Sequence, residues 1–123
     1  MKNRFIVITL LVWVAAGFAC RHETIMPAAT VSFQTDVLPI LAGNCNQPQC
    51  HGGQNPGEAK PLTTYDEVMS DNRIVAGKPH SSPLYKRLIA TGSGVMPVSP
   101  QPPLTSNQIQ IIYIWILQGA NNN

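Results

Sequence analysis

The chain has 123 residues, of which 44% are hydrophobic and 11% are charged, and its formal net charge is +2. This length is enough for one small domain with a single hydrophobic core. Two of the eight basic residues, Lys2 and Arg4, stand at the very start, so the rest of the chain carries as many acidic as basic residues. A surface without net charge gives no electrostatic basis for binding nucleic acid, and we expect no such partner.

The N-terminus has the pattern of an export signal. After the basic start, an almost unbroken apolar run extends from Phe5 to Phe18, shorter than the ~20 residues of a membrane span. The small residue Ala19 then precedes Cys20, as at the cleavage site of a secretory leader. We therefore predict a signal peptide over residues 1–19 and an exported protein on the periplasmic side.

Cys20 is a candidate lipidation site. The preceding Gly17-Phe18-Ala19 resembles the recognition sequence of lipoprotein signal peptides, with Gly17 where Leu is usual. We expect a lipid on Cys20 that anchors the chain to a membrane; the alternative is ordinary cleavage that leaves a free thiol. The composition of residues 20–31 predicts a flexible linker, followed by one domain over 32–120 and a polar tail over 121–123.

The domain is expected to begin with a helix. From Ser32, a candidate N-cap, apolar residues recur with the spacing of one helix face, at Phe33, Val37, Ile40 and Leu41. The pattern ends near Asn44. Because Pro39 is tolerated only in a first turn, the helix is either kinked there or begins at Asp36.

The middle of the chain predicts two short helices between loops. The many glycines and prolines in residues 46–60 exclude regular structure. Residues 64–69 then suit a helix capped by Thr63 or Thr64, with acidic residues in its first turn. After the turn at Gly77-Lys78-Pro79, a helix is expected to start at Pro83 with Ser81 or Ser82 as its cap and to end at Gly92.

The last apolar segment, Ile109 to Leu117, fits both strand alternation and helical spacing. The ends of the segment decide the matter. Thr105 and Gln108 form a capping box, and Gly119 stands where a helix stops. We therefore predict a helix, preceded by an extended loop over residues 91–103, and an all-α fold.

The motif with the most chemistry is Cys45-Asn46-Gln47-Pro48-Gln49-Cys50-His51. Two thiols can form thioethers with the vinyl groups of haem, and a histidine directly after the second thiol can coordinate the iron. Two residues usually separate the cysteines, whereas four do so here. On an ideal helix the sulfurs would then lie ~140° apart, so we expect a looped-out insertion around Pro48. From the motif alone, a disulfide, a zinc site and a redox-active thiol pair remain alternatives.

A second iron ligand would come from a methionine or another histidine, and the candidates are Met96, Met69, Met26, His80 and His22. Met96 is favoured because the proline-rich loop around it can hold a side chain rigidly. The alternative is that Met96 fills a gap in the core.

The order of these features resembles the class I cytochrome c superfamily, in particular the small cytochrome c domains of planctomycete type. The similarity covers about residues 32–120. The first helix of the pattern, Phe-x-x-Asp followed by apolar residues and a proline, is matched by Phe33, Asp36, Val37, Pro39 and Ile40. The Gly-Lys-Pro turn and the Ser-x-Leu segment with its basic pair are matched by Gly77, Lys78, Pro79, Ser82, Leu84, Lys86 and Arg87. The Met-Pro pair and the final helix are matched by Met96, Pro97, Leu104, Thr105, Trp115, Ile116, Gly119 and Ala120. The sequence departs from the pattern in its cysteine spacing and at Val98, where a second proline is common.

The resemblance implies a cytochrome c-like fold of about four short helices around one haem, with long loops rich in proline and glycine. It implies thioethers at Cys45 and Cys50, with His51 as proximal ligand and Met96 as distal ligand. Lys86 or Arg87 could pair with a haem propionate.

We therefore expect a membrane-anchored lipoprotein with one covalent haem c that passes single electrons between other redox proteins and is not itself an enzyme. The alternatives are a cofactor-free lipoprotein stapled by a disulfide and a haem enzyme of peroxidase type.

Overall fold

The computed structural model describes residues 29–52 and 59–123 of the chain. The predicted signal peptide, Cys20 and most of the linker lie outside the described residues. Within them there are helices and no strand, which confirms the all-α prediction at this level. The α-helices are α2 (Leu38–Asn44), α3 (Tyr65–Met69), α4 (Pro83–Leu88) and α5 (Ser106–Leu117), and the helical turns of other types are Phe33–Val37, Ser70–Asn72, Pro79–Ser81 and Gly92–Gly94.

The first helix begins at Phe33 and is irregular ahead of its proline. The Ser32 side chain accepts a hydrogen bond from the Thr35 N–H, which confirms Ser32 as the N-cap. Residues 33–37 form a π-helical turn, and Pro39 is the second residue of α2, which follows this turn without a break. The alternative start at Asp36 is therefore wrong.

The caps of α3 and α4 differ in kind. Thr64, one of the two predicted caps, caps α3 and forms a full capping box with Glu67. Ser82 occupies the N-cap position of α4, but its hydroxyl makes no capping bond there. It instead accepts from the Val75 N–H at 2.9 Å and donates to the Lys78 carbonyl at 3.1 Å. The capping role predicted for Ser81 or Ser82 is thus wrong, because the buried hydroxyl binds the preceding turn.

Helix α5 starts earlier than its apolar run. It begins at Ser106 behind the predicted capping box of Thr105 and Gln108 and ends before Gly119, whose φ of 105° favours glycine. α4, in turn, ends at Leu88 rather than at Gly92, which opens the next helical turn.

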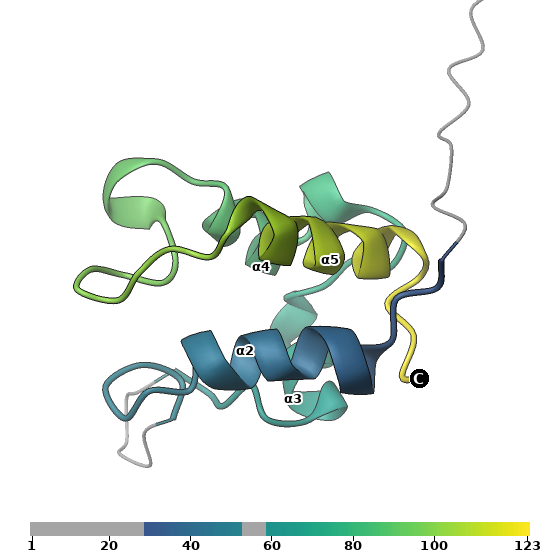
Figure 1. The fold of residues 1–123 in the computed structure, drawn as a ribbon, viewed down its shortest axis with the longest axis horizontal. Coiled ribbons are helices and arrows are strands. Elements are labelled where there is room, and N and C mark those ends of the chain that lie inside the picture. Colours follow the sequence, from purple (N-terminus) through teal and green to yellow (C-terminus); the bar gives the residue numbers. More distant parts are fainter. Residues whose placement is uncertain (1–28, 53–58) are drawn as a thin grey trace, which may run out of the picture.

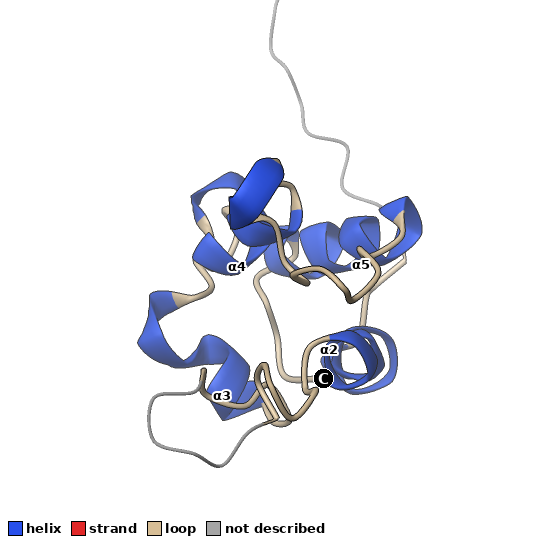
Figure 2. Cartoon of the chain, turned by 90° about the vertical axis from the view of Figure 1, so that its left-hand side faces the viewer, coloured by secondary structure: helices blue, strands red, loops and turns tan. Residues whose placement is uncertain are grey.

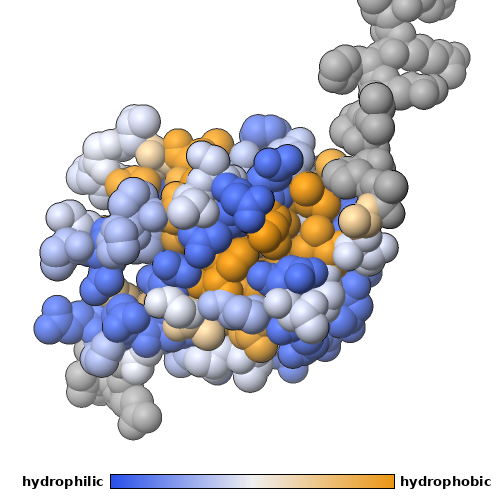
Figure 3. Space-filling model, in the orientation of Figure 1, coloured by the Kyte–Doolittle hydropathy of each residue, from blue (hydrophilic) through white to orange (hydrophobic). Residues whose placement is uncertain are grey.

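The first and last helices pack on each other through aromatic rings. The ring centroids of Phe33 and Trp115 lie 5.4 Å apart, and Tyr65 from α3 meets Phe33 edge to face at 5.2 Å. All three rings belong to one hydrophobic core or pack against it. In the view of Figure 3, apolar side chains gather between α5 and α2, with polar residues around them. Trp115 therefore packs against the first helix.

The C-terminal residues, expected as a polar tail, are bonded to both helices of this pair. Asn123 accepts a hydrogen bond from the Phe33 N–H at 2.9 Å through its side-chain oxygen. The Trp115 indole N–H donates to the Asn121 carbonyl at 2.9 Å.

Seen from one end, α2, α3, α4 and α5 surround the centre of the molecule (Figure 2). No helix within residues 29–52 and 59–123 is both long enough and apolar enough to cross a membrane.

Candidate functional site

The Cys45–His51 segment folds back on the end of α2. The Cys45 N–H still donates to Leu41 as a continuation of the helix, at 2.9 Å. The chain then turns, with the Cys50 N–H bonded to the Gln47 carbonyl at 2.8 Å, and the His51 N–H returns to the Cys45 carbonyl at 3.1 Å. The four intervening residues therefore loop out, as predicted, and His51 is brought back beside Cys45.

Two residues fix the shape of this loop. Asn46 binds Leu62 twice, donating to its carbonyl and accepting from its N–H, both at 2.9 Å. Gly52 lies so close to the Asn46 carbonyl that a Cβ at this position would overlap it. The loop is thus closed by its own backbone and tied to the segment that precedes α3.

His51 is oriented by a backbone carbonyl. Its Nδ1 lies 2.8 Å from the main-chain oxygen of Lys60. Because a carbonyl oxygen can only accept, Nδ1 carries the proton in this contact. The neutral ring then has an unprotonated Nε2, which is the form that coordinates a metal.

A cavity of about 660 Å³ brings the predicted site residues together. Its lining includes Cys45, Cys50, His51 and Met96. The volume lies within the ~300–1,000 Å³ of small-molecule and cofactor sites. Much of the remaining wall is apolar and comes from α2, α4 and the loops: Leu41, Ala59, Leu62, Pro83, Leu84, Leu88, Pro97 and Val98.

Met96 is the one predicted second ligand that lies at this cavity among those that the structure describes. Its side chain is 37% exposed, so the core-filling alternative does not describe it. Met69 is half-buried and packs against the hydrophobic core. Met26 and His22 lie outside the described residues.

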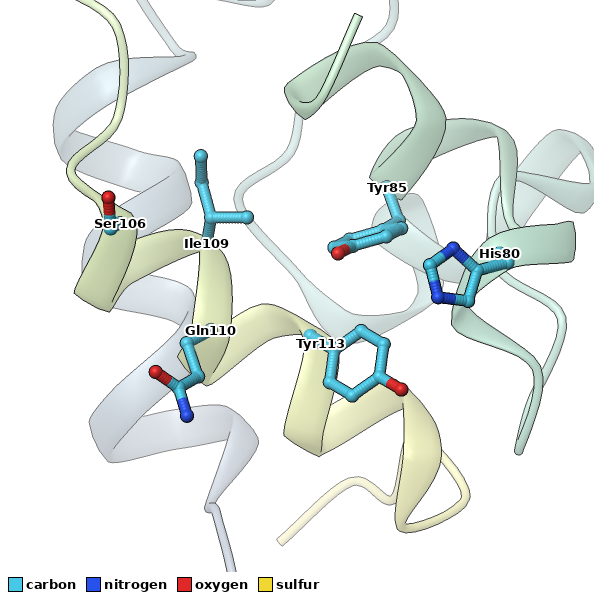
Figure 4. A pocket seen from close by; sticks show the side chains of 6 residues that line it. All are labelled: His80, Tyr85, Ser106, Ile109, Gln110 and Tyr113. Carbon is cyan, nitrogen blue, oxygen red and sulfur yellow. The ribbon is translucent and has the colours of Figure 1, made fainter. Parts of the chain in front are cut away.

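His80, another of the candidate ligands, lies in a separate recess of about 490 Å³. Its ring contacts Tyr85 and Tyr113, with centroids 5.4 and 5.7 Å away, and the two tyrosines contact each other at 5.4 Å. Figure 4 shows the three rings gathered between α4 and α5. None of the other predicted site residues lines this recess.

The larger cavity is lined by two cations, Arg73 and Arg87, and by no acidic residue in the described part of the chain. Arg87 was expected near a bound anion and Lys86 was its alternative; only Arg87 lines the cavity. Arg73 was not predicted as a residue of the site, because it follows a short helical turn and belongs to no recognisable motif. Its guanidinium donates to the Glu67 carbonyl at 2.9 Å and pairs with Asp71 at 3.3 Å.

Cys45 and Cys50 are free thiols in this structure. Burial of Cys45, and next the proximity of Cys50, raise the pKa of the Cys45 thiol to about 11. It is therefore protonated at neutral pH. In the described ranges, no three His, Cys, Asp or Glu side chains are grouped as a metal ion would need.

Comparisons of this chain with models of protein families, with curated proteins and with solved structures found no match.

Proposed function

We propose that the chain is an electron carrier of the cytochrome c type that holds one covalent haem c in the 660 Å³ cavity. Cys45 and Cys50 would carry the thioethers, with His51 and Met96 as axial ligands. The observation that carries the proposal is that these four residues, from two separate segments of the chain, line one cavity. A cytochrome c-like fold belongs to the same proposal and is supported by the packing of the first helix on the last.

The residues at the cavity fit such a group in three ways. The apolar wall suits a flat hydrophobic ring system. The guanidiniums of Arg73, which also pairs with Asp71, and of Arg87 line the cavity and suit the two carboxylates that the ring carries. The bond of His51 Nδ1 to Lys60 leaves the other ring nitrogen available as a ligand.

When bound, haem supplies a one-electron couple whose potential depends on its axial ligands and on its burial. The residues around the cavity decide whether that couple serves electron transfer or catalysis. His51 and Met96 would both hold the iron, so no coordination position would remain for a substrate, which supports electron transfer rather than catalysis. Leu41, Leu62 and Leu88 line the cavity with apolar surface and limit the access of water.

The proposal includes export and anchoring. Signal-peptide cleavage after Ala19 and a lipid on Cys20 would hold the domain at the periplasmic side of a membrane, where covalent haem attachment to exported thiols takes place. Its partners would then be other redox proteins.

Covalent attachment can be tested directly. We would produce the full chain in a bacterial host that exports and matures c-type cytochromes, denature the purified protein, and extract it with acidified organic solvent. Haem bound through Cys45 and Cys50 stays with the polypeptide, whereas in the double variant Cys45→Ser/Cys50→Ser all haem is extracted. Complete extraction from the wild-type protein would contradict the proposal and favour the cofactor-free alternative.

A further inference from the structure

Lys60 connects the proximal histidine to a surface ion pair. Its main-chain oxygen lies 2.8 Å from His51 Nδ1, and its ammonium group lies 2.8 Å from Asp71 Oδ1. The Asp71 carboxylate is therefore connected to the imidazole ring of His51 through one residue, Lys60. The two ends of this connection are distant in sequence, since Asp71 follows α3 and His51 precedes it.

Asp71 is held in an uncommon backbone conformation. Its φ is 57° and ψ 27°, and the next residue, Asn72, has a φ of 54°. Asp and Asn adopt this left-handed region more readily than other residues that carry a side chain, so the conformation suits both positions.

The carboxylate of Asp71 uses both oxygens. Oδ1 binds Lys60, and Oδ2 lies 3.3 Å from the guanidinium of Arg73, which lines the cavity. The same guanidinium binds the Glu67 carbonyl near the end of α3. Asp71 thus links the segment that orients His51 to a wall of the cavity and to a helix end.

We propose that Asp71 is a positioning residue for His51, acting through Lys60: it keeps the Lys60 carbonyl at the distance that fixes the tautomer and direction of the imidazole. The inference rests on the proposed function, since it concerns His51 as an iron ligand. An exposed ion pair adds little to overall stability. Its effect here is local and appears at the Nδ1–H···O bond, because ligand histidines depend on this partner for their orientation.

The test compares two variants with opposite changes in charge. Asp71→Asn removes a negative charge but keeps the shape and the tolerance of left-handed φ, and Lys60→Gln removes the positive partner. Asp66→Asn is the matched control, an exposed acid in the first turn of α3 and outside this network. In the reduced haem protein, NMR measures the rate at which the His51 Nδ1 proton exchanges with solvent.

The inference predicts exchange that is about two- to fivefold faster in both Asp71→Asn and Lys60→Gln, the range that loss of an exposed ion pair allows, and unchanged in Asp66→Asn. A purely electrostatic effect would make the exchange faster in one variant and slower in the other. That result, or a wild-type exchange rate in either variant, overturns this inference and leaves the proposed function standing. A wild-type protein that acquires no haem overturns the proposed function, and this inference with it.

Discussion

The main-chain N–H of Met96 donates a hydrogen bond of 2.9 Å to the carbonyl oxygen of Arg87, in the last turn of α4. This bond attaches the proline-rich loop to a helix that also lines the cavity through Leu84 and Leu88. The position of the Met96 side chain is therefore tied to α4 as well as to its own loop. In Figure 1 the loop that carries Met96 and the loop of the Cys45–His51 segment lie at the same end of the molecule, the first above the second.

We predict that Met96→Ala keeps covalent haem but loses the weak long-wavelength absorption band of a sulfur-ligated ferric haem. Its potential should fall by on the order of 0.1 V, a small part of the ~0.8 V that axial ligands span. Met69→Ala is the control, because Met69 packs on the core. The control should keep the band and lose up to about 2 kcal/mol of stability. A band that persists in Met96→Ala would show that another sulfur is the ligand.

Replacing each of two glycines near the end of α2 with alanine should have opposite effects, harmful at one position and stabilising at the other. In Gly52→Ala, the new Cβ overlaps the Asn46 carbonyl, so the loop must open and haem incorporation should fall several-fold. Gly43 has no atom within 4 Å of a Cβ and lies in α2, so Gly43→Ala should raise stability by about 0.5–1 kcal/mol. Haem content per protein, measured by absorbance, checks the first prediction, and urea unfolding checks the second. Equal haem content in Gly52→Ala and the wild type would mean that the loop is not closed as described.

The aromatic contact between the first and last helices should carry much of the stability. Trp115 is 1% exposed and its ring lies tilted against that of Phe33, so Trp115→Ala should cost about 3–5 kcal/mol. Trp115→Phe keeps an aromatic ring but loses the indole bond to the Asn121 carbonyl, and it should cost clearly less. Urea unfolding of the haem-bearing protein measures both. A cost below about 1 kcal/mol for Trp115→Ala would contradict this packing.

The capping box of α3 should make stability depend on pH. Hydrogen bonds from Thr63 and then Thr64 hold the pKa of the Glu67 carboxyl below its usual 4.5. A carboxyl with a lowered folded-state pKa stabilises the fold above its unfolded-state pKa, and this contribution is lost as the pH falls through the folded-state value. The melting temperature of the wild type should therefore fall below about pH 4.5 more steeply than that of Glu67→Gln. Parallel curves for the two proteins would contradict the assignment.

Local signals predicted most of the helices because caps and breakers act over a few residues. Thr64 with Glu67, Thr105 with Gln108 and Gly119 each marked a helix end, and the structure has helix ends there. Pro48 likewise marked the looped-out insertion. Ser82 was misassigned because the competing partners of its hydroxyl, Val75 and Lys78, could not be seen in the local pattern.

The cavity itself could be predicted only in part. The Cys45–His51 motif and Met96 carry recognisable chemistry, and the sequence singled them out. Arg73 and Lys60 reach the site through tertiary contacts, with Arg73 lining the cavity and Lys60 bonded to His51 by its backbone. Every residue has a backbone carbonyl, so no pattern in the sequence indicates that the carbonyl of Lys60 binds His51.

The mass of the intact, exported protein tests the central claim most directly. If the cavity holds haem on Cys45 and Cys50, the polypeptide will be heavier by the mass of one haem and will have no thiol at either position that reacts with an alkylating reagent. A colourless protein whose mass is two hydrogens below that of the reduced chain, with Cys45 joined to Cys50, would contradict it.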